Sequence, residues 1–233
     1  MRRAKWVLIV PLALLVLAVG GTWVYINVFR DDAPERLTLE SNSSDTTVAT
    51  AEDASASTGG AIDGTWTPTS ASQAGYRVNE VLFGQRAEAV GRTNSVTGRL
   101  VITGTTVSEA TFTVDMTTVA SDENRRDNQF RGRIMDVATY PTSTFTLTSP
   151  VELDSLPDAG EQITVNGTGK LALRGTTKTV TIPLTAQLDG DTIKVQGTVP
   201  ITFDEWGIPN PSFGPAETED HGELEFLLVF AKG

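Results

Sequence analysis

Residues 121–145 read SDENRRDNQFRGRIMDVATYPTSTF, and they interrupt an otherwise continuous two-residue alternation of apolar and polar side chains. Phe130, Ile134 and Val137 recur at helical spacing, so this stretch predicts a short helix with one apolar face. Ser121 is suited to cap its start, whereas Gly132 favours one or two turns over a longer unbroken helix. Tyr140-Pro141 ends the helix and returns the chain to a strand.

Strands are predicted on both sides of this insert. Alternating apolar positions occur in the stretches 76–78, 100–102, 112–116, 145–147, 163–173, 180–188, 193–203 and 226–230. Asp189-Gly190 between two of these stretches indicates a tight hairpin. About eight antiparallel strands usually close into a barrel, because closure removes edges that would pair with other molecules. The predicted fold is therefore all-β, an eight-stranded antiparallel barrel with one short helical insert.

The N-terminal part of the chain differs in composition. Residues 6–29 form an uncharged apolar run that follows Arg2, Arg3 and Lys5, and as a helix this run is long enough to cross a bilayer core of about 30 Å. We expect residues 1–30 to be a cytoplasmic N-terminus and a single transmembrane anchor. A cleaved signal peptide is the alternative, although its apolar region is normally shorter, about 7–15 residues.

Residues 31–60 are rich in Ser, Thr, Ala, Asp and Glu, and we expect them to be a flexible acidic linker. The remaining domain, 61–233, carries 13 basic and 22 acidic side chains, which disfavours nucleic acid as a partner. A basic cluster at Arg125, Arg126, Arg131 and Arg133 suits a solvated helix face better than an anion site. The anchor predicts a single-pass protein of the cell membrane with its C-terminal domain on the extracytoplasmic side.

Four stretches resemble the YceI-like family of lipocalin-like lipid-binding proteins over about 66–232. They are RDNQFRGRIMDVATYPTSTF, GTGKLALRGTTKTVTIPL, ITFDEWGIPNP and ELEFLLVFAK. Arg126, Asp127, Tyr140 and Pro141 correspond to the family's helical insert, and Gly169, Leu171, Gly175 and Lys178 to its hairpin. The resemblance implies a lipocalin-like barrel whose apolar bore holds a polyisoprenoid chain. The sequence departs from the family between Trp66 and Val96, where it carries extra polar residues.

The resemblance also implies which side chains line the bore. Periodicity alone does not distinguish a lined channel from a solid core, because both need the same inward apolar positions. The expected ligand-binding residues are Tyr76, Val78, Phe112, Val114, Met116, Phe130, Ile134, Phe145, Leu171, Leu173, Ile182, Phe203, Trp206, Phe226 and Leu228.

The expected function is therefore a membrane-tethered binding protein for a long-chain isoprenoid lipid of polyprenol or quinone type. The alternative is a ligand-free exported β-domain that acts through its surface in interaction or stress response. A homodimer is expected if the helical insert exposes its apolar face.

No catalytic constellation is recognisable in the sequence. His221 is the single histidine and lies in the polar stretch PAETEDHGE, and the chain has no cysteine. We therefore expect no enzyme activity, no bound transition metal and no cofactor other than a bound isoprenoid lipid or quinone.

Overall fold

The computed structural model describes residues 33–39, 62–82, 84–214 and 216–233. Its strands are β1 (Gly64–Pro68), β2 (Gln73–Leu82), β3 (Gln85–Thr93), β4 (Val96–Thr103), β5 (Thr106–Asp115), β6 (Thr142–Leu147), β7 (Val151–Glu152), β8 (Gln162–Leu173), β9 (Thr176–Asp189), β10 (Thr192–Thr202), β11 (Ala216–Thr218) and β12 (His221–Lys232). The helical elements are α2 (Asn124–Gln129), a π-helical turn (Phe130–Ile134) and two 3-10 turns (Met116–Thr118 and Asp204–Trp206).

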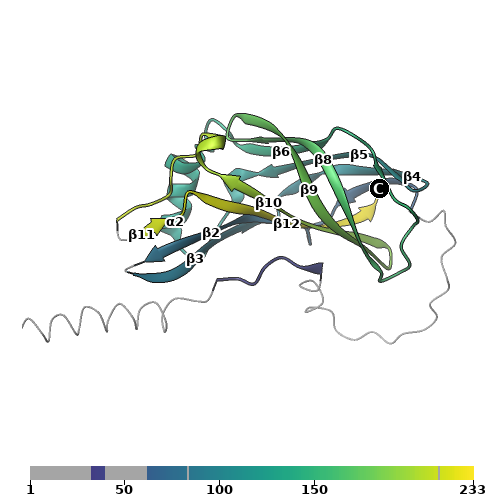
Figure 1. The fold of residues 1–233 in the computed structure, drawn as a ribbon, viewed down its shortest axis with the longest axis horizontal. Coiled ribbons are helices and arrows are strands. Elements are labelled where there is room, and N and C mark those ends of the chain that lie inside the picture. The colour runs from purple at the N-terminus through teal and green to yellow at the C-terminus, as the bar shows by residue number, and fades with distance from the viewer. Residues whose placement is uncertain (1–32, 40–61, 83, 215) are drawn as a thin grey trace, which may run out of the picture.

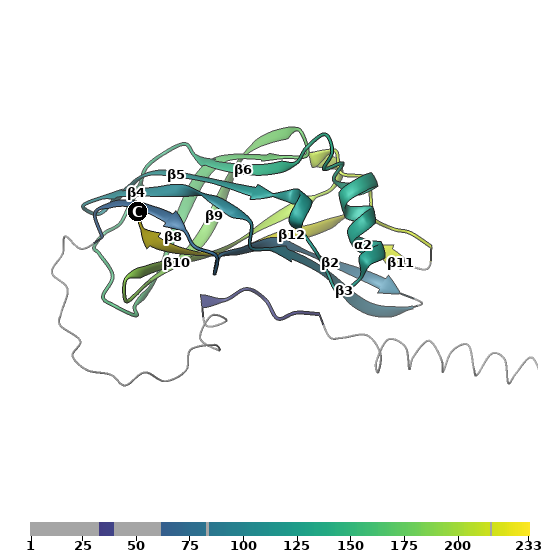
Figure 2. The same cartoon turned by 180° about the vertical axis from the view of Figure 1, so that it is seen from behind.

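Eight of these strands close into the predicted antiparallel barrel. Their order around the ring is β1-β4-β5-β6-β8-β9-β10-β12, and β12 returns to β1. Figures 1 and 2 show an elongated barrel with α2 and β11 near one end and the C-terminus near the other. β2 pairs with the first half of β12 and carries β3 and β11, so these strands extend the wall at the α2 end.

Sequence alternation produces this architecture because successive side chains of a strand point to opposite faces of the sheet. In β8 and β9 the register places Gly167 opposite Ile182 and Leu171 opposite Lys178. The turn predicted at Asp189-Gly190 joins β9 to β10, and Gly190 adopts φ 57, a conformation that glycine allows at little cost.

The helical insert is shorter than one regular helix and contains a π-helical turn. The backbone N–H of Met135 donates to the Phe130 carbonyl at 2.8 Å, a five-residue step that includes Gly132. Glu123, not Ser121, caps α2 by accepting from the Arg125 N–H, whereas Ser121 donates to the buried Asp127 carboxylate. Phe130 and Met135 are buried against the barrel. The apolar face that would have favoured a homodimer is therefore covered within the chain.

Residues 33–39 differ from the prediction of a fully flexible linker. Leu37 and Leu39 are both buried and pack on Leu227, which is 1% exposed. Composition predicted too few apolar residues for this segment to fold alone, and the barrel supplies the surface that buries Leu37 and Leu39. The rest of the predicted linker and the predicted membrane anchor lie outside the described residues. Among the described residues, no helix has the length and apolar character needed to cross a membrane.

Candidate functional site

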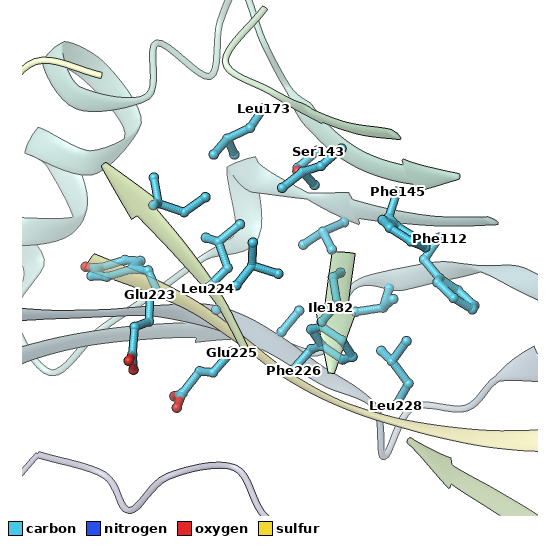
Figure 3. A pocket seen from close by; sticks show the side chains of 18 of the residues that line it. Phe112, Ser143, Phe145, Leu173, Ile182, Glu223, Leu224, Glu225, Phe226 and Leu228 are labelled. Atoms are coloured by element: carbon cyan, nitrogen blue, oxygen red, sulfur yellow. The ribbon is translucent and has the colours of Figure 1, made fainter. Parts of the chain in front are cut away.

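The barrel encloses an apolar cavity of about 730 Å³. This volume lies within the range of about 300–1,000 Å³ that is typical of small-molecule sites. The cavity extends between two hydrophobic clusters. One surrounds the helical insert and includes Phe130 and Leu173, and the other lies at the opposite end around Trp66 and Phe230. Figure 3 shows Phe112, Phe145, Phe226 and Leu228 pointing from different walls into the same space.

Burial of the wall residues distinguishes this cavity from a solid core. Phe112, Val114, Phe145 and Phe226 point inward, yet each is only partly buried, although both ends of the barrel contain fully buried side chains. Since the surface left exposed on these inward residues faces the cavity, the middle of the barrel is a lined bore.

The structure places all but one of the expected ligand-binding residues on the cavity wall. Those on the wall are Tyr76, Val78, Phe112, Val114, Met116, Phe130, Ile134, Phe145, Leu171, Leu173, Ile182, Phe203, Phe226 and Leu228. Trp206 does not line it. Its side chain is 3% exposed within the cluster at the α2 end, and the Lys178 ammonium lies 5.3 Å from its ring centroid. Its neighbour Ile208 reaches the wall instead.

Glycines on adjacent strands position three of the aromatic rings. A Cβ on Gly91 would lie 2.4 Å from Cε1 of Tyr76, and one on Gly197 would lie 2.5 Å from Cζ of Phe226. Gly169 stands in the same relation to Phe145, at 2.4 Å from Cζ. Each ring therefore packs against a glycine of the neighbouring strand and lies close to the wall of the bore.

Gln187 borders the opposite end, but seven polar and charged side chains of the lining gather at the end formed by α2, β11 and the tip of the β2–β3 hairpin. They are Glu80, Asp122, Glu123, Arg125, Arg126, Gln129 and Thr218. Ile62, Leu153, Pro157 and Leu188 line the opposite end, which is mainly apolar. Because polar side chains are favoured where a cavity meets water, we identify the α2 end as the mouth. Glu223 and Glu225 also border the cavity, but Figure 3 shows their carboxylates pointing away from the apolar side chains.

An ion-pair network lies across the mouth. Arg126 of α2 contacts Asp122 and lies 3.6 Å from a carboxylate oxygen of Glu80 on β2. The Tyr76 ring stacks on Phe130 with centroids 5.0 Å apart. Burial raises the pKa of the Tyr76 hydroxyl, which therefore stays neutral and can donate a hydrogen bond.

Glu80 was absent from the expected site, although the sequence contains its signal. Glu80 shares inward parity with Tyr76 and Val78 on β2, and an acidic residue at such a position predicts a partner. That partner is Arg126, which the sequence assigned to the helical insert and its basic cluster without linking it to Glu80.

The bore is long as well as apolar. Inward residues of β10 run from Ile193 to Ile201, and Phe203 follows at the strand's end, a path of about 33 Å along the strand at 3.3 Å per residue. Because the strands of a barrel tilt by about 35–45° from its axis, the bore is about 25 Å long. This is a little less than the thickness of a bilayer hydrocarbon core, about 30 Å.

His221 is not part of the lining, and among the described residues no three His, Asp or Glu side chains gather as a metal site would require.

A YceI-like domain matches residues 66–230. The chain belongs to the YceI-like family. A polyisoprenoid binding domain from Saccharophagus degradans, implicated in plant cell wall breakdown, superimposes with a TM-score of 0.58 at 19% identity, covering 72% of this chain and 98% of that one. Burkholderia cenocepacia BcnA superimposes with a TM-score of 0.54 at 22% identity, covering 70% and 98%. At these identities the likeness shows the fold alone. No curated protein matches the sequence.

Proposed function

We propose that this YceI-like protein binds a long-chain isoprenoid lipid of polyprenol or quinone type in the barrel, without a catalytic role. The open bore carries the proposal, because inward aromatic side chains at mid-barrel leave apolar surface uncovered. Covering that surface with a hydrocarbon chain gains about 25 cal/mol per Å². The family membership and the polyisoprenoid binding domain of similar fold support the same ligand class.

The mouth favours a neutral headgroup. Arg126 already contacts Asp122 and Glu80, and Glu123 adds a further negative charge, so the five charged side chains of the mouth sum to −1. This net negative charge would repel a diphosphate headgroup. The Tyr76 hydroxyl can instead donate to a hydroxyl or carbonyl oxygen.

The proposal includes location. The apolar run 6–29 supports a single-pass membrane anchor, and the basic residues before it support an extracytoplasmic barrel. A lipid carrier in this position would exchange its ligand with the outer surface of the cell membrane.

Native mass spectrometry of the full chain tests the binding function. We expect one prenyl lipid per chain, identified after solvent extraction. Val114→Trp fills the middle of the bore with an apolar side chain and should abolish the adduct. Thr146→Trp places the same side chain on an exposed position of β6 and should retain it. A wild-type chain that is empty and takes up neither added polyprenol nor added quinone would contradict the proposal and favour the alternative, a ligand-free β-domain that acts through its surface.

A further inference from the structure

The segment 33–39, here called the strap, lies along the outer face of the barrel beside β12 and β2 (Figures 1 and 2). Leu37 and Leu39 pack on Leu227, and Arg36 pairs with Glu223 at 2.5 Å. Main-chain carbonyls of the strap accept hydrogen bonds from two arginines of the wall. The Arg77 guanidinium donates to the Pro34 carbonyl at 2.7 Å, and Arg92 donates to the Glu35 carbonyl.

These contacts define the direction of the strap. Arg36 lies at Glu223, and Leu37 and Leu39 lie at Leu227, so from 36 to 39 the strap follows β12 away from the mouth. Its N-terminal end therefore points toward the mouth, the end at which the chain continues back to the apolar run 6–29.

The chain length between the apolar run and the strap is sufficient to reach the level of the mouth. Three residues lie between Phe29 and Ala33, and the four steps along the chain span at most about 14 Å. From Arg77, which contacts the strap at Pro34, β2 continues for five residues to Leu82 at the rim, about 17 Å. The fully extended chain from Phe29 to Ala33 is thus about as long as the distance from Arg77 to the rim at Leu82.

The rim carries two exposed apolar side chains among exposed polar ones. Among the described residues, the exposed large hydrophobic side chains are Val81 at 38% and Phe213 at 49%. Val81 lies one residue before the end of β2, opposite Glu217 of β11, and Phe213 borders the cavity beside β11. The Arg125 guanidinium lies 4.8 Å from the Phe213 ring centroid. Phe together with Lys or Arg occurs on surfaces that lie in the membrane interface, where the ring enters the apolar region and the cationic group stays among the headgroups.

We propose that the rim of the mouth rests on the lipid bilayer, with Val81 and Phe213 inserted at the interface and the strap holding the barrel in this orientation. This inference rests on the proposed function, because it takes residues 6–29 to be anchored in the membrane. The orientation lets an isoprenoid chain pass between bilayer and bore without exposing its apolar surface to water, the step that would otherwise limit its transfer.

Single-cysteine labelling tests the orientation, since the natural sequence has no cysteine. The full chain is reconstituted in vesicles of phosphatidylethanolamine and phosphatidylglycerol containing a polyprenol, with spin labels at Val81→Cys or Phe213→Cys. Asp191→Cys, an exposed position between β9 and β10 at the opposite end, is the control. We expect labels at 81 and 213 to collide with oxygen in the bilayer and to be shielded from a water-soluble nickel chelate, and the label at 191 to show the reverse.

A second variant separates docking from binding. Val81→Gln, at a rim position that does not line the cavity, should slow polyprenol uptake from vesicles about tenfold, while equilibrium binding of detergent-dispersed polyprenol is unchanged. Thr105→Gln, exposed in the β4–β5 turn, should change neither.

The outcomes distinguish the two proposals. Two results in a chain that binds polyprenol would overturn the rim proposal alone. Either the rim labels stay in water, or their spectra are broadened by the label of a second copy of the chain. Rim labels in the bilayer on a chain that never binds an isoprenoid would overturn the proposed function alone.

Discussion

Gly197→Ala should close part of the bore without unfolding the barrel. The new Cβ would lie 2.5 Å from Cζ of Phe226 and 3.0 Å from Cδ2 of Leu184. Since carbon atoms in contact are separated by about 3.5–4.0 Å, the Phe226 ring must shift by roughly 1 Å or more. The atoms in the way belong to side chains, and the space beside them is the cavity, so the ring can move into the bore.

The consequences for stability and binding differ in size. Overpacking costs about 1–3 kcal/mol, and the reduced freedom of the unfolded chain returns about 0.4–1 kcal/mol. We expect the free energy of unfolding to fall by no more than about 2.6 kcal/mol. A bound chain that retracts by two carbons loses about 1.6 kcal/mol at 0.8 kcal/mol per CH₂, which is about fifteenfold in affinity.

The assay is a titration of the full chain with a fluorescent polyprenol analogue, paired with urea unfolding. Gly132→Ala is the matched control, because a Cβ there meets nothing within 4 Å. Adding Phe226→Leu to Gly197→Ala should restore affinity by shortening the displaced side chain. Undiminished affinity in Gly197→Ala, with the fold intact, would refute the idea that this glycine keeps the bore open.

Three further outcomes are expected. Glu225→Gln should lower the free energy of unfolding by about 3–5 kcal/mol, measured in urea, because this 3% exposed carboxylate neutralises Arg92 at 2.7 Å and Arg77 at 3.4 Å. Glu109→Gln, which breaks an exposed pair, should cost at most about 1 kcal/mol, and equal losses would contradict the reasoning. Leu37→Ala should raise the rate of tryptic cleavage after Arg36 about thirtyfold, because the loss of about 2 kcal/mol of burial free energy lets the strap open more often. Glu35→Gln should leave this rate unchanged, because Glu35 contacts Arg92 through its backbone carbonyl. The hydrogen bond to Asp220 raises the pKa of His221 in the folded chain. The stabilisation that the protonated imidazole gives is therefore present below pH 6.5 and is lost as pH rises through the raised pKa of the folded chain. An NMR titration of this single histidine with a midpoint at or below 6.5 would disprove that bond in solution.

The sequence predicted the ring of strands and its inward face because both follow from local periodicity. Phe112, Phe145 and Phe226 lie at positions whose parity alone assigns them to the interior. The same rule applied to β2 identifies Glu80 as inward, although its partner on α2 is not visible in sequence. Trp206 shows the limit of this reasoning, because it follows β10 in a 3-10 turn, where parity no longer applies.

The strap was not predictable for a different reason. Leu37 and Leu39 are too few to fold alone, and the surface that buries them belongs to β12 near the other end of the chain. No local pattern links two such segments. The predicted membrane anchor lies outside the described residues, so the anchor and the extracytoplasmic location of the barrel stay predictions.

The sequence by itself determined that the chain forms antiparallel strands with one apolar face, because a two-residue alternation is typical of half-buried strands, and the family resemblance implied that these strands close into a barrel. Only the tertiary structure decided that the interior of this barrel is a bore. Whether Phe226 fills the centre or lies along the wall depends on Gly197 of the neighbouring strand, and whether the mouth is polar depends on Glu80 meeting Arg126. These are contacts between residues distant in sequence, and their geometry exists only once the strands have paired.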